Sequence, residues 1–283
     1  MLTKKRLISY VLSIIFAVCI LVLVIMLDLN FTIFSKSNFK SKAHSVNYYN
    51  RIYDVIMKSC EDDTMQSGFD NSILYNVIST QDVEKDSNRV IDKLYDNWEL
   101  NIDTSKQRAT LNSNIDQFIA NRGYQVDDET RADINVYEDT IEDIYVKTIS
   151  YSKEHINDIA AQLQKLKKMS KIIIVMMVVL GAIVAIAIFK INKPAIGVSM
   201  MAAGAILIFI KLYSATTLAV NNILILNRPF SDLVAAVINQ VLQHMLVIGI
   251  ILFVVGIIWT IIFEIRKNYT RMLLLDEHSC IIR

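Results

Sequence analysis

Long apolar runs alternate with one long polar segment along the 283-residue chain. Residues 7–27 form a run of 21 residues without a charged side chain, and residues 172–189 form a second run of 18. Two further apolar runs cover residues 195–210 and 245–263. Because about 20 helical residues cross a hydrocarbon core of about 30 Å, this pattern predicts four transmembrane helices.

The predicted fold class is all-α, with four transmembrane helices and a large helical extracytoplasmic domain between helices one and two. The predicted parts are, in order, 1–28 (cytoplasmic leader and transmembrane helix 1), 29–170 (extracytoplasmic helical domain with stalk), 171–190 (transmembrane helix 2), 195–220 (transmembrane helix 3), 221–244 (outer loop or interfacial helix), 245–264 (transmembrane helix 4) and 265–283 (cytoplasmic tail). Apolar residues from Phe230 to Leu242 share one helical face, which indicates either an interfacial helix or an extension of the fourth transmembrane helix.

The polar segment 29–170 has helical periodicity throughout, with Gly68 and Gly123 as plausible helix ends. One predicted helical face consists of Val46, Tyr49, Ile52, Tyr53, Ile56 and Cys60. From residue 131 to residue 189 the pattern continues for 59 residues without a helix breaker, or about 90 Å if it is helical throughout. We therefore expect a helical stalk that continues into the second transmembrane helix. Its apolar seam, which includes Ile156, Ile159, Leu163 and Leu166, packs either against the domain's own helices or, as a coiled coil, against a second copy.

The basic start of the chain precedes an apolar run that is longer than the 7–15 residues of a signal-peptide core, and no small-residue cleavage site follows it. This favours an uncleaved anchor over a signal peptide.

Charge is distributed unevenly between the polar segment and the rest of the chain. Residues 31–170 hold 17 Lys and Arg against 23 Asp and Glu, a net charge of −6, whereas the remainder holds 12 against 5, a net charge of +7. Only short loops determine orientation, and cytoplasmic loops are rich in Lys and Arg. With both termini in the cytoplasm, the short inner segments carry nine basic residues and the short outer loop carries Arg228 alone. The opposite orientation would reverse these numbers. We therefore expect a plasma-membrane protein with cytoplasmic N- and C-termini.

Two groups of charged residues near the predicted spans are candidate site residues. Lys165, Lys167, Lys168 and Lys171 precede the second transmembrane helix, where they form either an interfacial collar or a docking site for anionic lipid headgroups or an envelope polymer.

Lys211 is the only charge within a predicted span, and it follows about 24 Å of helix, so we place it in the outer leaflet. It either reaches the interface beside Tyr213 or forms an intramembrane ion pair with Asp28 at the end of the first helix.

The sequence carries few signs of catalytic or metal chemistry. It has no glycine-rich phosphate loop, no C-x-x-C, no H-E-x-x-H and no G-x-S-x-G, and its histidines lie in separate segments. Glu138, Asp139, Glu142 and Asp143 form an acidic block, which is more typical of a solvated or ion-paired helix face than of a calcium site. We expect no catalytic, cofactor-binding or metal-binding residues, no cofactor and no nucleic-acid partner. An internal disulfide is not expected from Cys19, Cys60 and Cys280.

The motifs SGFDNSIL and QDVEKD, between an anchor and a stalk that leads to three further spans, give the chain a layout that resembles uncharacterised multi-pass membrane proteins of Gram-positive bacteria. The resemblance implies no activity. We expect a non-enzymatic membrane protein whose outer helical domain binds, senses or scaffolds a partner at the cell surface. Its partners would be membrane lipids and either another protein or further copies of itself. The alternative is a subunit of a membrane transporter or channel complex, although the predicted spans contain few polar groups.

Overall fold

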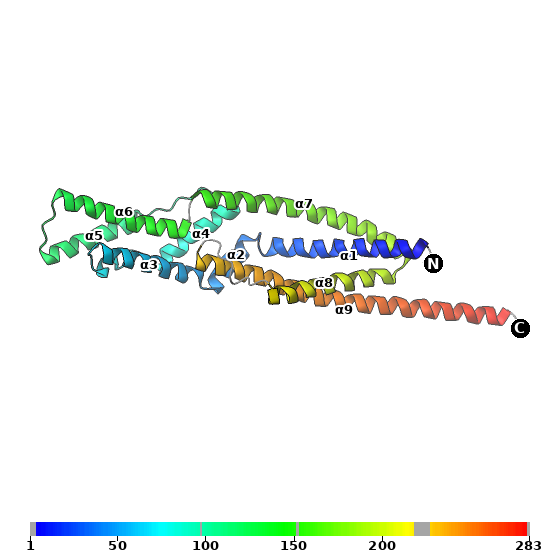
Figure 1. Ribbon diagram of the computed structural model, residues 1–283. Helices are drawn as coiled ribbons and strands as arrows, with labels where there is room; N and C mark the ends of the chain where they lie inside the picture. Colours follow the sequence, from blue (N-terminus) through cyan, green and yellow to red (C-terminus); the bar gives the residue numbers. More distant parts are fainter. Residues whose placement is uncertain (1–3, 97, 151–152, 218–226, 282–283) are drawn as a thin grey trace. The chain divides into compact units, whose positions relative to one another are not determined.

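The computed structural model describes residues 4–96, 98–150, 153–217 and 227–281, and all regular secondary structure in these residues is helical (Figure 1). The elements are α1 (Lys4–Phe31), α2 (Lys36–Ser45), α3 (Tyr48–Gln66), the short 3₁₀ helix η1 (Asn71–Leu74), α4 (Thr80–Asp96), α5 (Ser105–Arg122), α6 (Asp128–Ser150), α7 (Lys153–Ile191), α8 (Pro194–Thr217) and α9 (Arg228–Ile281). The all-α class expected from the sequence is confirmed.

The chain divides into two compact units. The apolar unit consists of Met1–Ile33, Lys167–Asn222 and Val237–Arg283, and the polar unit consists of Phe34–Leu166 and Ile223–Ala236. Helices α7 and α9 each contribute residues to both units.

In the part of the chain that the structure describes, four helical segments are long and apolar enough to cross a membrane, as the hydrophobic runs predicted. They are Leu7–Phe31, Ile156–Ile191, Pro194–Ser214 and Arg228–Arg266. The last segment belongs to a single 54-residue helix, so residues 228–244 extend the fourth apolar helix instead of forming a separate interfacial one. This helix starts where the Asn227 side chain accepts a hydrogen bond from the backbone N–H of Phe230 at 2.9 Å. Pro229 is compatible with this first turn, because its missing N–H has no partner to lose there.

Within the apolar unit, glycine residues allow the backbones of α8 and α9 to come into direct contact. A Cβ atom on Gly204 would lie 2.5 Å from the carbonyl oxygen of Gly249, and one on Gly256 would lie 2.6 Å from the carbonyl oxygen of Gly197. The glycines lie seven residues apart on each helix and pair in antiparallel order, so they form one seam of two close contacts. Small residues at such seams are typical of helices that associate in lipid, where van der Waals packing replaces the hydrophobic effect.

Serine hydroxyls and one amide link α1 to α8 and to the end of α7. The Ser199 hydroxyl lies 2.9 Å from the carbonyl oxygen of Ser13 and can donate to it. Asn192, which follows α7, donates from its side-chain nitrogen to the Ser9 hydroxyl at 3.3 Å. Ser199 and Ala203, a small-residue pair visible in the sequence, are both buried. These contacts satisfy polar groups inside an apolar bundle without placing charge there.

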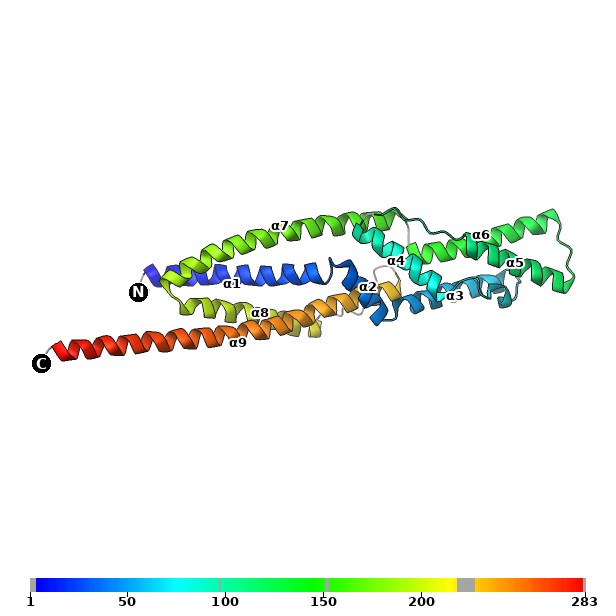
Figure 2. The ribbon, with the colours of Figure 1, turned by 180° about the vertical axis from the view of Figure 1, so that it is seen from behind.

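The polar unit has an aliphatic and tyrosine core built mainly on α3, α4 and α6. Helices α5 and α6 run side by side in opposite directions (Figure 2). The helical face predicted for α3 is correct, since Ile52, Ile56 and Cys60 are fully buried. Burial raises the pKa of the Cys60 thiol to about 12, so it stays protonated at neutral pH.

The first turns of α9 complete the polar unit. Phe230 and Leu233 are buried and line a small cavity together with Tyr48 of α3 and Ile156 of α7. Asp232 lies 2.5 Å from the guanidinium of Arg51 on α3. The sequence pattern predicted an outer loop or interfacial helix, or an extension of the fourth helix; the extension is what the structure has. The packing of this segment in the polar unit was not predicted.

The expected stalk is only partly within the described residues. Residues 151–152 separate α6 from α7 and lie outside them, so helical continuity across the whole stalk is not described. In α7, Ile156 and Ala160 are buried, whereas Leu166 is 54% exposed. Ten residues at 3.6 per turn place Leu166 about 80° around the helix from Ile156, which takes it off the buried face. The buried face of α7 therefore differs from the predicted seam at Leu166.

The glycine seam predicts that substitution by alanine changes the melting temperature differently at two helical glycines, one inside the seam and one outside it. Gly204→Ala should lower the melting temperature of the detergent-solubilised protein, because overpacking costs about 1–3 kcal/mol. Gly181→Ala is the matched control, since its Cβ would lie 3.8 Å from that of Cys19, an ordinary contact. Alanine is otherwise favoured over glycine in helices, so this control should be neutral or stabilising. Equal melting temperatures for the two variants would show that α8 and α9 are not in backbone contact.

Candidate functional site

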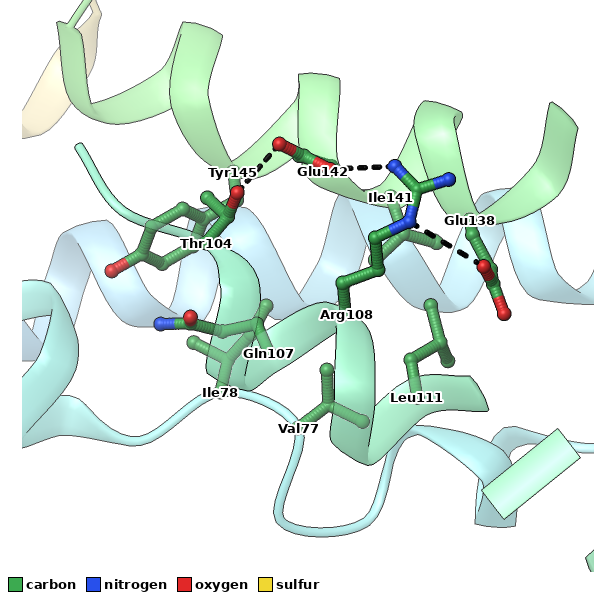
Figure 3. Close-up of a pocket in the computed structure, with 10 residues that line it drawn as sticks. All are labelled: Val77, Ile78, Thr104, Gln107, Arg108, Leu111, Glu138, Ile141, Glu142 and Tyr145. Carbon is green, nitrogen blue, oxygen red and sulfur yellow. Dashed lines mark hydrogen bonds and ion pairs between the residues drawn. The ribbon is translucent and has the colours of Figure 1, made fainter. Parts of the chain in front are cut away.

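The polar unit contains an ion-pair cluster between α5 and α6 (Figure 3). Arg108 of α5 approaches three carboxylates of α6, with its nitrogens 3.6 Å from Glu138, 2.7 Å from Asp139 and 3.1 Å from Glu142. The Thr104 hydroxyl donates to the other oxygen of Glu142 at 2.5 Å. Three of the four residues of the acidic block are thus paired with a cation of the neighbouring helix, and the fourth, Asp143, lies 2.7 Å from Lys147 of α6 itself. An ion-paired helix face is the interpretation that the sequence favoured over a calcium site.

A second hydrogen-bonded carboxylate of the polar unit is that of Asp86 on α4. The Tyr145 hydroxyl donates to Asp86 at 2.8 Å, and Arg89 lies 3.1 Å from the other oxygen of this carboxylate. Burial and the negative charge of Asp86 raise the pKa of Tyr145. A protonated tyrosine that donates to a buried carboxylate fits a structural role, because both groups are satisfied.

Two cavities inside the polar unit are small. The cavity lined by Arg108, Glu138, Glu142 and Tyr145 measures about 10 Å³, and so does the cavity beside Phe230. A volume of this size holds about one water molecule. Within the described residues, no three or more His, Cys, Asp or Glu side chains form a group that could hold a metal ion.

The apolar unit contains an acid–imidazole pair. Oδ1 of Asp28 on α1 lies 2.8 Å from Nδ1 of His244 on α9, and the Asp28 side chain is 5% exposed. Its second oxygen, Oδ2, is buried and has no hydrogen-bond partner in the described part of the chain. Ionisable residues at membrane depth are costly and mark functional sites by default. This pair is therefore the candidate functional site of the apolar helices.

A groove of about 470 Å³ lies over the pair. Its walls are Val24, Leu27 and Phe31 of α1 and Val247 and Ile248 of α9. Asp28 and His244 are the polar residues among its lining. The histidine side chain is 44% exposed, so a proton or a polar group of a ligand can reach the imidazole more easily than the carboxylate.

The structure does not bring Lys211 into an ion pair with Asp28. Among the described residues the partner of Asp28 is His244, and Lys211 is half-buried on α8. His244 was not a predicted site residue, because residue 244 fell in the segment 221–244 predicted as an outer loop or interfacial helix. The available signal was the apolar period through Val237, Val241 and Met245, which continues the fourth helix backwards past His244.

Three of the four lysines before the second apolar run are exposed. Lys165, Lys168 and Lys171 are exposed and Lys167 is half-buried. Next to them, Ser170 is buried and accepts a hydrogen bond at 2.7 Å from the side chain of Asn30 on α1. The lysines are therefore free to reach headgroups, and the headgroup contact stays a prediction.

No family model, curated protein or solved structure matches this chain. The residues and the geometry of the two units are therefore the available guide to its function.

The Asp28–His244 pair predicts energetic coupling between α1 and α9. In a double-mutant cycle of Asp28→Asn and His244→Gln, the unfolding free energies should be non-additive by about 0.5–3 kcal/mol, as for residues in direct contact. The control cycle pairs Asp28→Asn with Lys211→Met and should be additive within about 0.5 kcal/mol. Thermal or denaturant unfolding in one detergent measures both cycles. Coupling in the Lys211 cycle alone would contradict the observed pairing.

Proposed function

We propose that this chain is a non-enzymatic, multi-pass plasma-membrane protein whose polar unit lies outside the cytoplasm and binds, senses or scaffolds a partner at the cell surface. In this proposal the apolar unit anchors the protein and both termini are cytoplasmic. The observation that carries the proposal is that α7 and α9 each contribute to the polar unit and to an apolar, membrane-length segment.

The shared helices give partner binding a physical route to the membrane segments. The start of α9 is fixed in the polar unit by the Arg51–Asp232 ion pair and by burial of Phe230 and Leu233. Further along the same helix, Gly249 and Gly256 pack against α8 in the apolar unit. A partner that shifts α9 at its start therefore acts on a helix that also belongs to the apolar core.

The small size of the two cavities inside the polar unit favours a partner that binds on its surface. The two enclosed cavities hold about one water each, whereas two open surface grooves measure about 590 and 780 Å³. Small-molecule sites are clefts or cavities of about 300–1,000 Å³ that bury most of the ligand's surface, whereas these two grooves are open. A macromolecular or polymeric partner, or a second copy of the chain, fits this surface better than an engulfed metabolite.

The orientation rests on the distribution of basic residues. Three groups of basic residues lie in segments assigned to the cytoplasm: Lys190 in the last turn of α7, Lys193 between α7 and α8, and Lys4, Lys5 and Arg6 at the start of the chain. Positively charged short loops stay inside during insertion.

Labelling with a membrane-impermeant maleimide tests this orientation. Cys60 is unsuitable as a reporter, because it is fully buried and its thiol pKa is raised to about 12. Ser113→Cys, at an exposed position of α5, should react on intact cells in a chain whose native cysteines are replaced. In a second chain that retains only Cys280, labelling should require permeabilisation. Labelling of Cys280 on intact cells would contradict the proposed topology.

A transporter or channel subunit is the second candidate function, and the Asp28–His244 pair beside a groove is the observation that favours it. Proton flux into liposomes containing the purified chain separates the two candidates. The surface-binding proposal predicts flux equal to that of empty liposomes for the native chain and for Asp28→Asn. It also predicts a stoichiometric partner in mild detergent. Flux that Asp28→Asn abolishes would favour transport instead.

A further inference from the structure

One of the two open surface grooves of the polar unit combines an exposed aromatic ring with several side-chain amides. We call it the Tyr75 groove. It measures about 590 Å³ and lies between the η1 segment and α5. Six of its lining residues carry the inference: Tyr75, Asn114, Gln117, Phe118, Asn121 and Arg122.

Tyr75 is held in an exposed position by a well-anchored loop. Its side chain is 74% exposed, while Ile73, Leu74, Val77 and Ile78 on either side are buried. The side-chain amide of Asn114 donates to the carbonyl oxygens of Ile73 and Tyr75 at 2.8 and 2.9 Å. Asn76 has a φ of 57°, the left-handed conformation, which asparagine tolerates better than most residues. The loop backbone that carries the Tyr75 ring is thus already ordered, so binding a ligand would cost little backbone entropy.

The opposite wall of the groove is a helical face rich in amides. Asn114, Gln117, Phe118 and Asn121 recur at the spacing of one α-helix face. Asn114 is used to anchor the loop, whereas Gln117 and Asn121 are exposed and have no hydrogen-bond partner among the described residues. An amide side chain offers two donors and an acceptor, so this wall can bond to groups that both donate and accept.

The charged residues of the groove are already engaged within the protein. The Arg122 guanidinium carbon lies 4.5 Å from the centre of the Phe118 ring. Asp70 accepts a hydrogen bond from the backbone N–H of Ser72 at 2.8 Å, and this bond lowers the pKa of its carboxyl group. Asp70 and Arg122 are the charged residues among the lining and have opposite signs, so the groove has no net charge. This disfavours a phosphate-rich or strongly acidic polymer, which would need a net positive groove.

We propose that the Tyr75 groove binds a neutral saccharide segment of a surface polymer. A pyranose ring has an apolar C–H face, which packs on the exposed tyrosine ring, and hydroxyl groups, which both donate to and accept from Gln117 and Asn121. An extended peptide fits less well, because the described residues contain no sheet edge to which a strand could add. The inference names a ligand class for the proposed surface-binding function and rests on it.

Titration calorimetry of the full chain with neutral tetrasaccharides tests the inference. The protein is kept in a polyoxyethylene detergent, since detergents with sugar headgroups would compete for the groove. The probes are the tetramers of β-1,4-linked N-acetylglucosamine and of β-1,4-linked glucose. At least one should bind, and Tyr75→Ala and Gln117→Ala should each weaken binding by about tenfold or more, with unchanged melting temperatures.

Two control variants separate the ring from the hydroxyl group and from exposed aromatic surface in general. Tyr75→Phe keeps the ring and should bind within about threefold of the native chain. Tyr124→Ala removes another exposed tyrosine (58% exposed) that does not line the groove, and it should bind like the native chain. No binding of either tetramer at millimolar concentration, or equal binding by Tyr75→Ala, would overturn the inference.

Labelling of Ser113→Cys distinguishes failure of this inference from failure of the proposed function, because residue 113 directly precedes Asn114 on α5. Outside labelling without saccharide binding would overturn the saccharide inference alone. No labelling from outside would contradict the surface location on which both depend.

Discussion

The backbone contact between α8 and α9 is the constraint on which the rest of the apolar unit depends. Four of the chain's seven glycines form it, and at Gly204 and Gly256 a methyl group would collide with a carbonyl oxygen of the facing helix. This contact fixes the position of α9 beside Leu207 of α8 and brings Val241 and Met245 into a common cluster with residues of α1. On the same helix α9, His244 lies one residue before Met245 of this cluster and pairs with Asp28 of α1.

The polar unit is stabilised differently. Its core buries aliphatic and tyrosine side chains, and its charges are paired across helices, as Arg108 shows with three carboxylates of α6. Exposed ion pairs contribute about 0–1 kcal/mol each, so the apolar core supplies most of the stability and the pairs fix the orientation of α5 on α6. A domain with small internal cavities and an anchored, exposed aromatic residue is suited to recognition at its surface.

The hydrophobic pattern predicted the all-α class and four apolar helices, because length and composition alone decide whether a helix can cross a membrane. It also predicted the buried face of α3, where Ile52, Ile56 and Cys60 repeat without interruption. It did not predict the pairing of Asp28. Partner choice depends on helix register in three dimensions, and a histidine outside the expected span was not considered as a partner for Asp28.

The exposure of Leu166 and the contribution of Phe230 to the polar unit were missed for a related reason. Periodicity shows which residues of a helix share a face, but it does not show which neighbouring element covers that face. The Tyr75 groove was also invisible in the sequence, because residues 70–76 and 114–122 meet only in the folded chain. The candidate sites depend on contacts between distant segments of the chain, whereas the helices depend on local sequence patterns.

Helix α9 is one uninterrupted helix that belongs to both units. Hydrogen–deuterium exchange of the full chain in detergent tests this continuity most directly, because a continuous, packed helix protects its amides over its whole length. A continuous α9 should show strong protection from Leu233 to Met245 without a gap. Rapid exchange confined to residues 235–240 would show a break between the two parts of α9, and α9 would then not connect the polar unit to the apolar helices.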